Sequence, residues 1–163
     1  MYYLGKKRKY GQMSQKFTIM DGFFYSYADE AYDKWKACTD KDEFNWKKET
    51  RILDYITADI ECQLHSWPWV EVDYIYVPCC IKKLSHWVLV VAHLKSRKLM
   101  VYDSMSKSKR SHKSVMTHLL RLAEIIPIVL CSINAFDGLG IEDTSSAAFS
   151  VDDHDAMPQQ ENW

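Results

Sequence analysis

The residues of this chain that could do chemistry are a histidine, an aspartate and a glutamine in three separate stretches. His86 and Asp103 each adjoin an apolar run, and Gln160 lies near the end of the sequence. A carboxylate that accepts the Nδ1 proton of an imidazole fixes the tautomer, so that the other ring nitrogen can take a proton from a thiol. Such a thiol becomes a nucleophile, and a glutamine amide is a common donor to an oxyanion. These three residue types are the ones that acyl transfer by a cysteine uses.

A predicted β-hairpin brings His86 and Asp103 together. Residues 87–92 form a continuous apolar run rich in β-branched side chains, which is typical of a central strand covered on both faces. Residues 99–102 predict the return strand. A two- or four-residue loop centred near Lys95 and Ser96 would place both side chains on the same face, as direct or diagonal neighbours with Cβ atoms about 5–8 Å apart.

Helices are predicted before and after these strands. The predicted segments are helices over 18–38, over 42–55 and from 114, and strands over 69–76, 87–92, 99–102 and 147–151. The last helix should bury Val115, Leu119, Leu122 and Ile126 on one face. Pro78 should close the strand over 69–76, and Pro127 should kink or end the last helix. Residues 104–114 predict a loop, and Gly138 and Gly140 mark a turn. This order of elements predicts an α+β fold.

Composition limits the classes of protein to which the chain can belong. The 163 residues fit one domain, and a hydrophobic content of 47% is enough for a core. The 21 basic and 22 acidic residues give a net charge of −1, which argues against direct nucleic-acid binding. No run of about 18 apolar residues is present, so no membrane span is predicted.

Five cysteines, an odd number with two adjacent, suit neither a disulfide framework nor a secreted protein. We therefore expect a reducing compartment, the nucleus or the cytoplasm. The basic residues 6–9 are equally consistent with a nuclear-localisation patch and with a solvated helix end. Cys79 and Cys80 lie close to His86 in sequence, but after a proline they are better explained as small buried or loop residues than as nucleophiles. No metal ligand set has the required spacing, and we expect no cofactor.

Four motifs in order carry a resemblance to a known family. They are Val77-Pro78, Ser85-His86-Trp87-Val88-Leu89, Val101-Tyr102-Asp103-Ser104 and Pro158-Gln159-Gln160-Glu161-Asn162. The pattern resembles the ubiquitin-like-protein (SUMO/sentrin)-specific proteases, in particular their divergent plant-type branch. The resemblance implies a papain-like cysteine protease fold with a mixed central sheet flanked by helices, and cleavage after a diglycine. It implies that His86 is the general base, Asp103 the orienting carboxylate, Gln160 the oxyanion donor and Trp87 the aromatic lid that binds substrate.

The resemblance also implies the partner, SUMO or another ubiquitin-like modifier with its conjugates. Residues 1–163 are interpreted as one partial peptidase domain, incomplete at both ends, with the resemblance clearest over 69–163. In the family the nucleophilic cysteine follows the glutamine by six residues, whereas this chain stops three residues after Gln160. We therefore expect the chain as it stands to be an inactive cysteine peptidase domain. The alternative is a non-catalytic pseudoprotease that binds a SUMO-like modifier.

Overall fold

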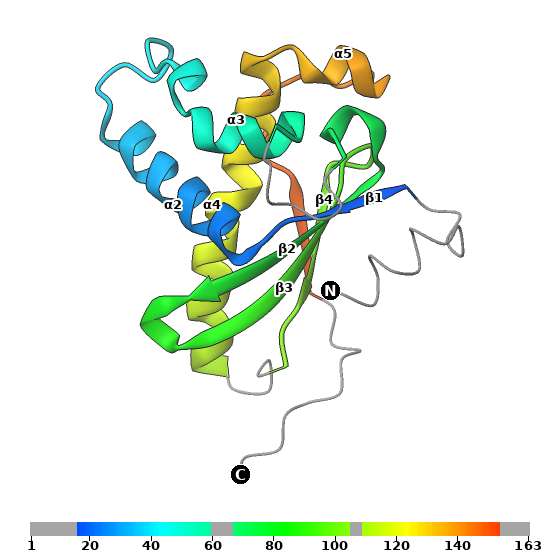
Figure 1. Ribbon diagram of the computed structural model, residues 1–163. Coiled ribbons are helices and arrows are strands. Elements are labelled where there is room, and N and C mark those ends of the chain that lie inside the picture. The colour runs from blue at the N-terminus through cyan, green and yellow to red at the C-terminus, as the bar shows by residue number, and fades with distance from the viewer. Residues whose placement is uncertain (1–15, 60–66, 105–108, 154–163) are drawn as a thin grey trace.

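A five-stranded mixed sheet crosses the middle of the molecule, with helices packed against it (Figure 1). The computed structural model describes residues 16–59, 67–104 and 109–153. The strands, in their order across the sheet, are β1 (Phe17–Ile19), β2 (Tyr74–Ile81), β3 (His86–His93), β4 (Lys98–Tyr102) and β5 (Ser150–Asp153). The two inner pairs of neighbours are antiparallel and the two outer pairs are parallel. The predicted α+β fold with a mixed central sheet flanked by helices is confirmed.

The helices between β1 and β2 begin later than the apolar periodicity predicts. They are α2 (Gly22–Ala37), the 3₁₀ turn η1 (Trp46–Lys48) and α3 (Thr50–Thr57). Asp21 caps α2 by accepting hydrogen bonds from the backbone N–H groups of Phe23 and Phe24, and the residues before this cap form β1. The prediction of a helix from residue 18 is therefore wrong at its start, because a three-residue strand is too short to show its own period.

Strand β2 differs from its prediction at both ends. Residues Trp69–Glu71 form the 3₁₀ turn η2, and the strand begins at Tyr74 and continues through Pro78 to Ile81. Strand β1 pairs with β2 only as far as Tyr76, so Pro78 lies where one edge of β2 has no neighbouring strand. A proline is tolerated at such an edge, because no ladder hydrogen bond is required there. The prediction that Pro78 closes the strand is wrong for this reason.

The hairpin of β3 and β4 agrees with its prediction. Strand β3 is central, and the pairing of His93 with Lys98 leaves a four-residue turn over 94–97. The pairings of Leu89 with Tyr102 and of Val90 with Val101 give the predicted register. The alternating burial along β3 and β4 places one row of side chains in the core beneath the helices and the other row on the opposite face.

Helix α4 (Lys109–Ser132) is the core helix of the fold. Its predicted face is confirmed, because these four side chains are buried: Val115, Leu119, Leu122 and Ile126. The helix starts earlier than predicted, inside the expected loop, and residues 112–132 are long and apolar enough for a membrane span by length and composition alone. Half of an 18-residue window in that segment is buried inside the protein, as expected of a core helix. The segment contains Lys113, Arg121 and Glu124, so it does not contradict the expected absence of a continuous apolar run.

Pro127 lies inside α4 and does not end it. A proline has no N–H to donate to the carbonyl four residues earlier, which here belongs to Ala123. That carbonyl instead accepts the backbone N–H of Phe149 at 3.0 Å, just before β5. The proline thus frees the acceptor that connects the last strand to the core helix. The predicted strand over 147–151 is found two to three residues later, as β5 (Ser150–Asp153).

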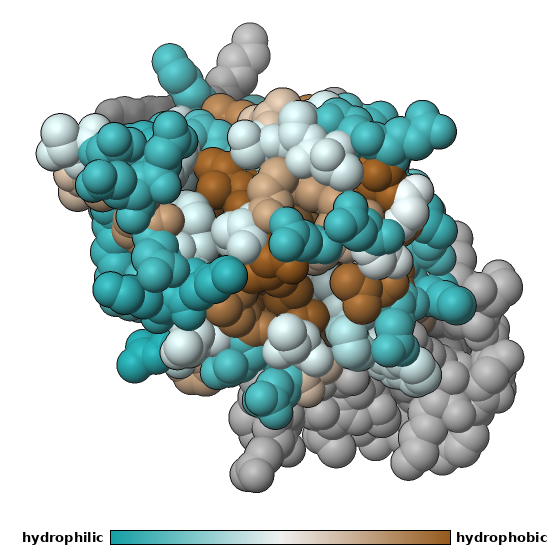
Figure 2. Space-filling view, turned by 90° about the horizontal axis from the view of Figure 1, so that it is seen from above, coloured by the Kyte–Doolittle hydropathy of each residue, from teal (hydrophilic) through white to brown (hydrophobic). Residues whose placement is uncertain are grey.

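The chain between α4 and β5 forms α5 (Ala135–Leu139) and then an extended loop. Gly138 lies within α5, and only Gly140, with φ of +61°, forms the predicted turn. Helices α3 and α5 lie at the same end of the molecule, and viewed from that end apolar side chains occupy the middle of the face with polar ones around them (Figures 1 and 2).

Candidate active site

The open end of the β3–β4 hairpin brings His86 and Asp103 into contact. Nε2 of His86 lies 2.6 Å from Oδ1 of Asp103. The register places Val88 opposite Asp103, so His86 is its diagonal neighbour on the same face of the sheet, as predicted. Both side chains continue the buried row of the sheet, with His86 7% exposed and Asp103 1% exposed. The structure therefore contains a buried imidazole–carboxylate pair at the strand ends.

A tight turn delivers His86 to this position. Strand β2 is followed by the 3₁₀ turn η3 (Lys82–Leu84), and Ser85 caps it in the left-handed conformation with φ of 48°. His86 then pairs with Ile81 at the first position of β3. The left-handed backbone of Ser85 reverses the chain within four residues, so the imidazole starts its strand inside the core instead of on a flexible loop. Sequence reasoning missed this role of Ser85, and nothing in the residue type indicates it.

The ring of His86 is turned the other way from the prediction. The carboxylate of Asp103 contacts Nε2, not Nδ1. Asp103 directly follows the last residue of the neighbouring strand β4. Nε2 is the ring nitrogen farther from the backbone of His86, and it is the one that contacts the carboxylate. Among the described residues, Nδ1 has no hydrogen-bond partner. An imidazole held by a carboxylate at Nε2 can exchange a proton at Nδ1, so the same chemistry is available with the two nitrogens exchanged.

Trp87 lies next to His86 but on the other side of β3, and its side chain is 58% exposed. Its indole covers the first residue of α2, where a Cβ on Gly22 would come within 2.9 Å of Cη2. Only a glycine allows this approach. Trp87 also lines a groove along α2 together with Phe23, Tyr27 and Cys80. Gly22 is thus a positioning residue that the sequence did not reveal.

None of the described cysteines hydrogen-bonds to His86, and two of them, Cys79 and Cys131, are poor nucleophiles. Cys79 is fully buried, and burial raises the pKa of its thiol well above the usual range. Burial also raises the pKa of Cys131. Cys38 and Cys80 are partly exposed. Gln160 lies outside the described residues, as does Cys62. Among the residues that the structure describes, no group of three His, Cys, Asp or Glu side chains could hold a metal ion.

A family comparison identifies the class of protein to which this fold and this pair belong. The family model of the Ulp1 protease family, C-terminal catalytic domain, matches residues 4–163. The chain therefore belongs to the Ulp1 protease family, which its motifs resemble. No curated protein sequence matches the chain.

Solved structures of Ulp1 are also similar to the chain. The SUMO protease Ulp1 with its catalytic cysteine oxidised to a sulfinic acid is 21% identical over 99% of this chain and 55% of that one, with a TM-score of 0.48. The Ulp1 protease domain in complex with Smt3, the yeast orthologue of SUMO, is 19% identical over 99% and 55%, with a TM-score of 0.47. The form with a sulfonic acid is 22% identical over 91% and 52%, with a TM-score of 0.45. This chain spans about half the length of these structures, and its family assignment rests on the family model.

Proposed function

We propose that this chain supplies the general base and the orienting carboxylate of a cysteine peptidase that cleaves after the diglycine of SUMO or a related modifier. The contact of 2.6 Å between buried His86 and Asp103 carries the proposal. Membership of the Ulp1 protease family supports the substrate class. Gln160 is proposed as the oxyanion donor on the family motif alone.

In the proposed reaction, Nδ1 of His86 takes the proton of a nucleophilic thiol while Asp103 stabilises the imidazolium through Nε2. The thiolate adds to the carbonyl carbon of the second glycine, and the resulting oxyanion accepts hydrogen bonds from donors such as Gln160. Collapse of the intermediate breaks the amide bond, and the imidazolium gives its proton to the departing amine. Water then hydrolyses the thioester, with His86 again as the base.

No described residue places a thiol at His86. We therefore propose that the chain as it stands does not hydrolyse the modifier. The test is a SUMO-like protein whose diglycine end carries an electrophilic warhead. We expect no covalent capture at any of the five cysteines, and capture at one of them would overturn this part of the proposal. Wild type and His86→Gln are then compared, with the same probe, in any longer protein of which this chain forms a part. Capture lost in the variant supports the role of His86, whereas equal capture contradicts it.

The second candidate is a binding module that holds the modifier without cutting it. The large exposed surface of Trp87, seated on Gly22, favours this candidate. Because the indole is mostly outside the core, Trp87→Ala should weaken binding of a SUMO-like protein at least tenfold and leave the fold intact. Trp67→Ala is the matched control, since Trp67 is also exposed. Equal affinities of wild type and Trp87→Ala, measured by calorimetry, would count against both the lid role and the binding module.

We further propose that the protein works in the nucleus or the cytoplasm, because the described cysteines are free thiols. Imaging of a fluorescent fusion tests this location, and secretion of the fusion would contradict it.

A further inference from the structure

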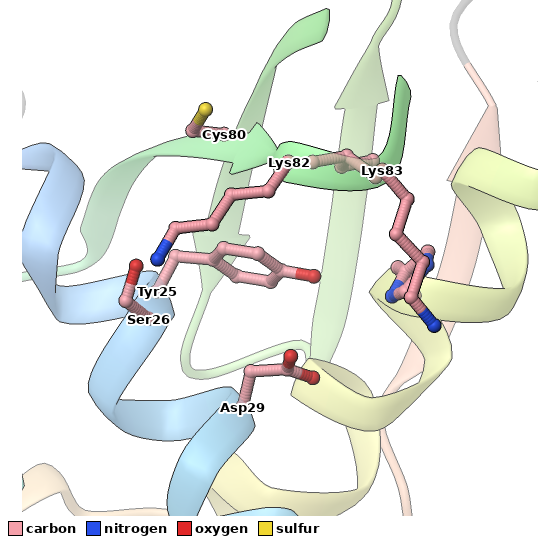
Figure 3. A pocket seen from close by; sticks show the side chains of 8 residues that line it. Tyr25, Ser26, Asp29, Cys80, Lys82 and Lys83 are labelled. Carbon is pink, nitrogen blue, oxygen red and sulfur yellow. The ribbon is translucent and has the colours of Figure 1, made fainter. Parts of the chain in front are cut away.

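A hollow beside the turn that leads into His86 contains a buried hydroxyl with no partner. The hollow lies between α2, the end of β2 and α4, and its lining includes Tyr25, Lys82, Lys83 and His118. Tyr25 is 4% exposed, and its hydroxyl has no hydrogen-bond partner among the residues that the structure describes. In Figure 3 this hydroxyl points into the space between Lys83 and Asp29. A buried polar group without a partner is destabilising, which makes it a marker of a missing ligand.

The hydroxyl of Tyr25 stays protonated at neutral pH, so it can donate a hydrogen bond to a ligand. Burial, with the nearby carboxylate of Asp29 as the next cause, raises the pKa of the Tyr25 phenol above its ordinary value. The group therefore keeps its proton. A ligand in the hollow would supply the hydrogen-bond acceptor that the Tyr25 hydroxyl lacks.

The other groups around the hollow are also donors. Lys82 and Lys83 form no ion pair with any described residue, and His118 and Ser26 add further N–H and O–H groups. The one acid in the lining, Asp29, is engaged by Arg121 at 2.9 Å. The charge of Asp29 is thus compensated from outside the hollow, while the two ammonium groups lack acidic partners within the described part of the chain. The hollow has a volume of about 210 Å³, which is enough for a small anion.

We propose that this hollow binds a phosphate group, with the Tyr25 hydroxyl, Lys82, Lys83 and His118 as its donors. A phosphate monoester carries nearly two negative charges and three acceptor oxygens at neutral pH, which match two unpaired ammonium groups and a buried hydroxyl better than a carboxylate does. The lysines belong to η3, whose cap Ser85 immediately precedes His86. A bound phosphate would therefore also hold the turn at the start of β3.

The test is a titration of the protein that is monitored by NMR. The three probes are inorganic phosphate, N-acetyl-O-phosphoserine amide and N-acetylglutamate amide. We expect saturable binding of phosphate that weakens at least tenfold in Tyr25→Phe and in the double variant Lys82→Ala/Lys83→Ala. Tyr74→Phe and Lys47→Ala are the matched controls and should bind as the wild type does. Tyr25→Phe keeps the buried ring, so its thermal stability should be equal or higher, and the lysine variant changes only exposed side chains.

Each outcome decides the proposal. Tighter binding of the phosphoserine probe indicates a phosphorylated side chain as the source, and tighter binding of inorganic phosphate indicates the free ion; both support the site. Equal or tighter binding of the glutamate probe contradicts the choice of phosphate. Phosphate binding that survives Tyr25→Phe and depends only on the lysines indicates an adventitious ion only, and absence of saturable binding overturns the site.

Discussion

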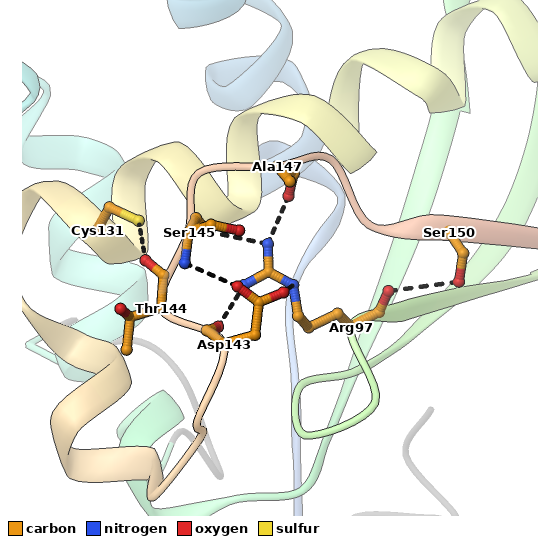
Figure 4. A network of polar contacts seen from close by, with 7 residues as sticks. All are labelled: Arg97, Cys131, Asp143, Thr144, Ser145, Ala147 and Ser150. Carbon is orange, nitrogen blue, oxygen red and sulfur yellow. Dashed lines mark hydrogen bonds and ion pairs between the residues drawn. The ribbon is translucent and has the colours of Figure 1, made fainter.

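The two ends of the β3–β4 hairpin hold a polar side chain in different ways. At the closed end, Arg97 donates three hydrogen bonds, to the carbonyls of Asp143, Ser145 and Ala147, and also pairs with the Asp143 carboxylate (Figure 4). Its guanidinium lies 5.2 Å from the ring centres of both Phe136 and Phe149. At the open end, the imidazole of His86 is paired with the described residues through Nε2 alone.

This difference indicates that the guanidinium of Arg97 supports the fold and that the imidazole of His86 is available for chemistry. The guanidinium of Arg97 holds the loop before β5, and the backbone N–H of Ser150 binds the Arg97 carbonyl at 3.0 Å. Its planar fork is satisfied by fixed carbonyls, which suits a structural role. The imidazole has a second nitrogen with no described hydrogen-bond partner, which suits proton transfer. We expect the first group to govern stability and the second to govern reaction with substrate.

The largest expected effect is at the closed end. Arg97→Ala removes three hydrogen bonds to a charged donor and leaves three carbonyls to find other partners, so the free energy of unfolding should fall by about 4 kcal/mol. Arg97→Lys keeps the charge but not the fork, and it should recover less than half of that loss. Urea unfolding measures both. A loss below about 1 kcal/mol for Arg97→Ala would show that the network does not hold the loop.

At the open end, two substitutions separate stability from chemistry. His86→Ala leaves the buried carboxylate of Asp103 without its imidazole and should destabilise the protein by about 3 kcal/mol. His86→Gln keeps an N–H donor of similar reach, so it should cost only about 1 kcal/mol. Neither variant can exchange a proton as an imidazole does. If His86→Gln were as unstable as His86→Ala, the pair would be structural in the same sense as Arg97.

The smallest effect concerns an exposed ion pair at the same turn as Arg97. Lys95 lies 2.8 Å from Asp73, and its hydrogen bond is the first cause of the lowered pKa of that carboxyl. A lowered pKa in the folded state gives stability that is complete above the ordinary aspartate pKa of about 3.9 and is lost as the pH falls through the folded value. Asp73→Asn should therefore cost about 0.5 kcal/mol at pH 6 and nothing at pH 2. A difference that persists at pH 2 would contradict this cause.

The sequence predicted those features that depend on local periodicity. The apolar run of β3 and the polar turn after it gave the hairpin register, and the register brings His86 to Asp103. The apolar spacing around Leu119 gave the buried face of α4. Both features follow from which side chains must leave water, which a single sequence contains.

The remaining features depend on contacts between distant segments. Pro78 stays within β2 because β1 ends before it, and Pro127 stays within α4 because Phe149 uses the carbonyl that it frees. The partners of Arg97 lie about fifty residues away in a loop without a periodic pattern. The ring orientation of His86 depends on the path of the neighbouring strand. No local rule contains this information, so these features had to be found in the structure.

The central claim is that Asp103 holds the ring of His86 through Nε2 and leaves Nδ1 for proton exchange. Side-chain ¹⁵N NMR of the histidines tests it most directly, in wild type and in Asp103→Asn. We predict that neutral His86 is the Nε2–H tautomer, with an Nε2 proton protected from exchange and shifted downfield, and that this signal is lost in Asp103→Asn. A wild-type ring found as the Nδ1–H tautomer, or a signal unchanged by the substitution, would contradict the account.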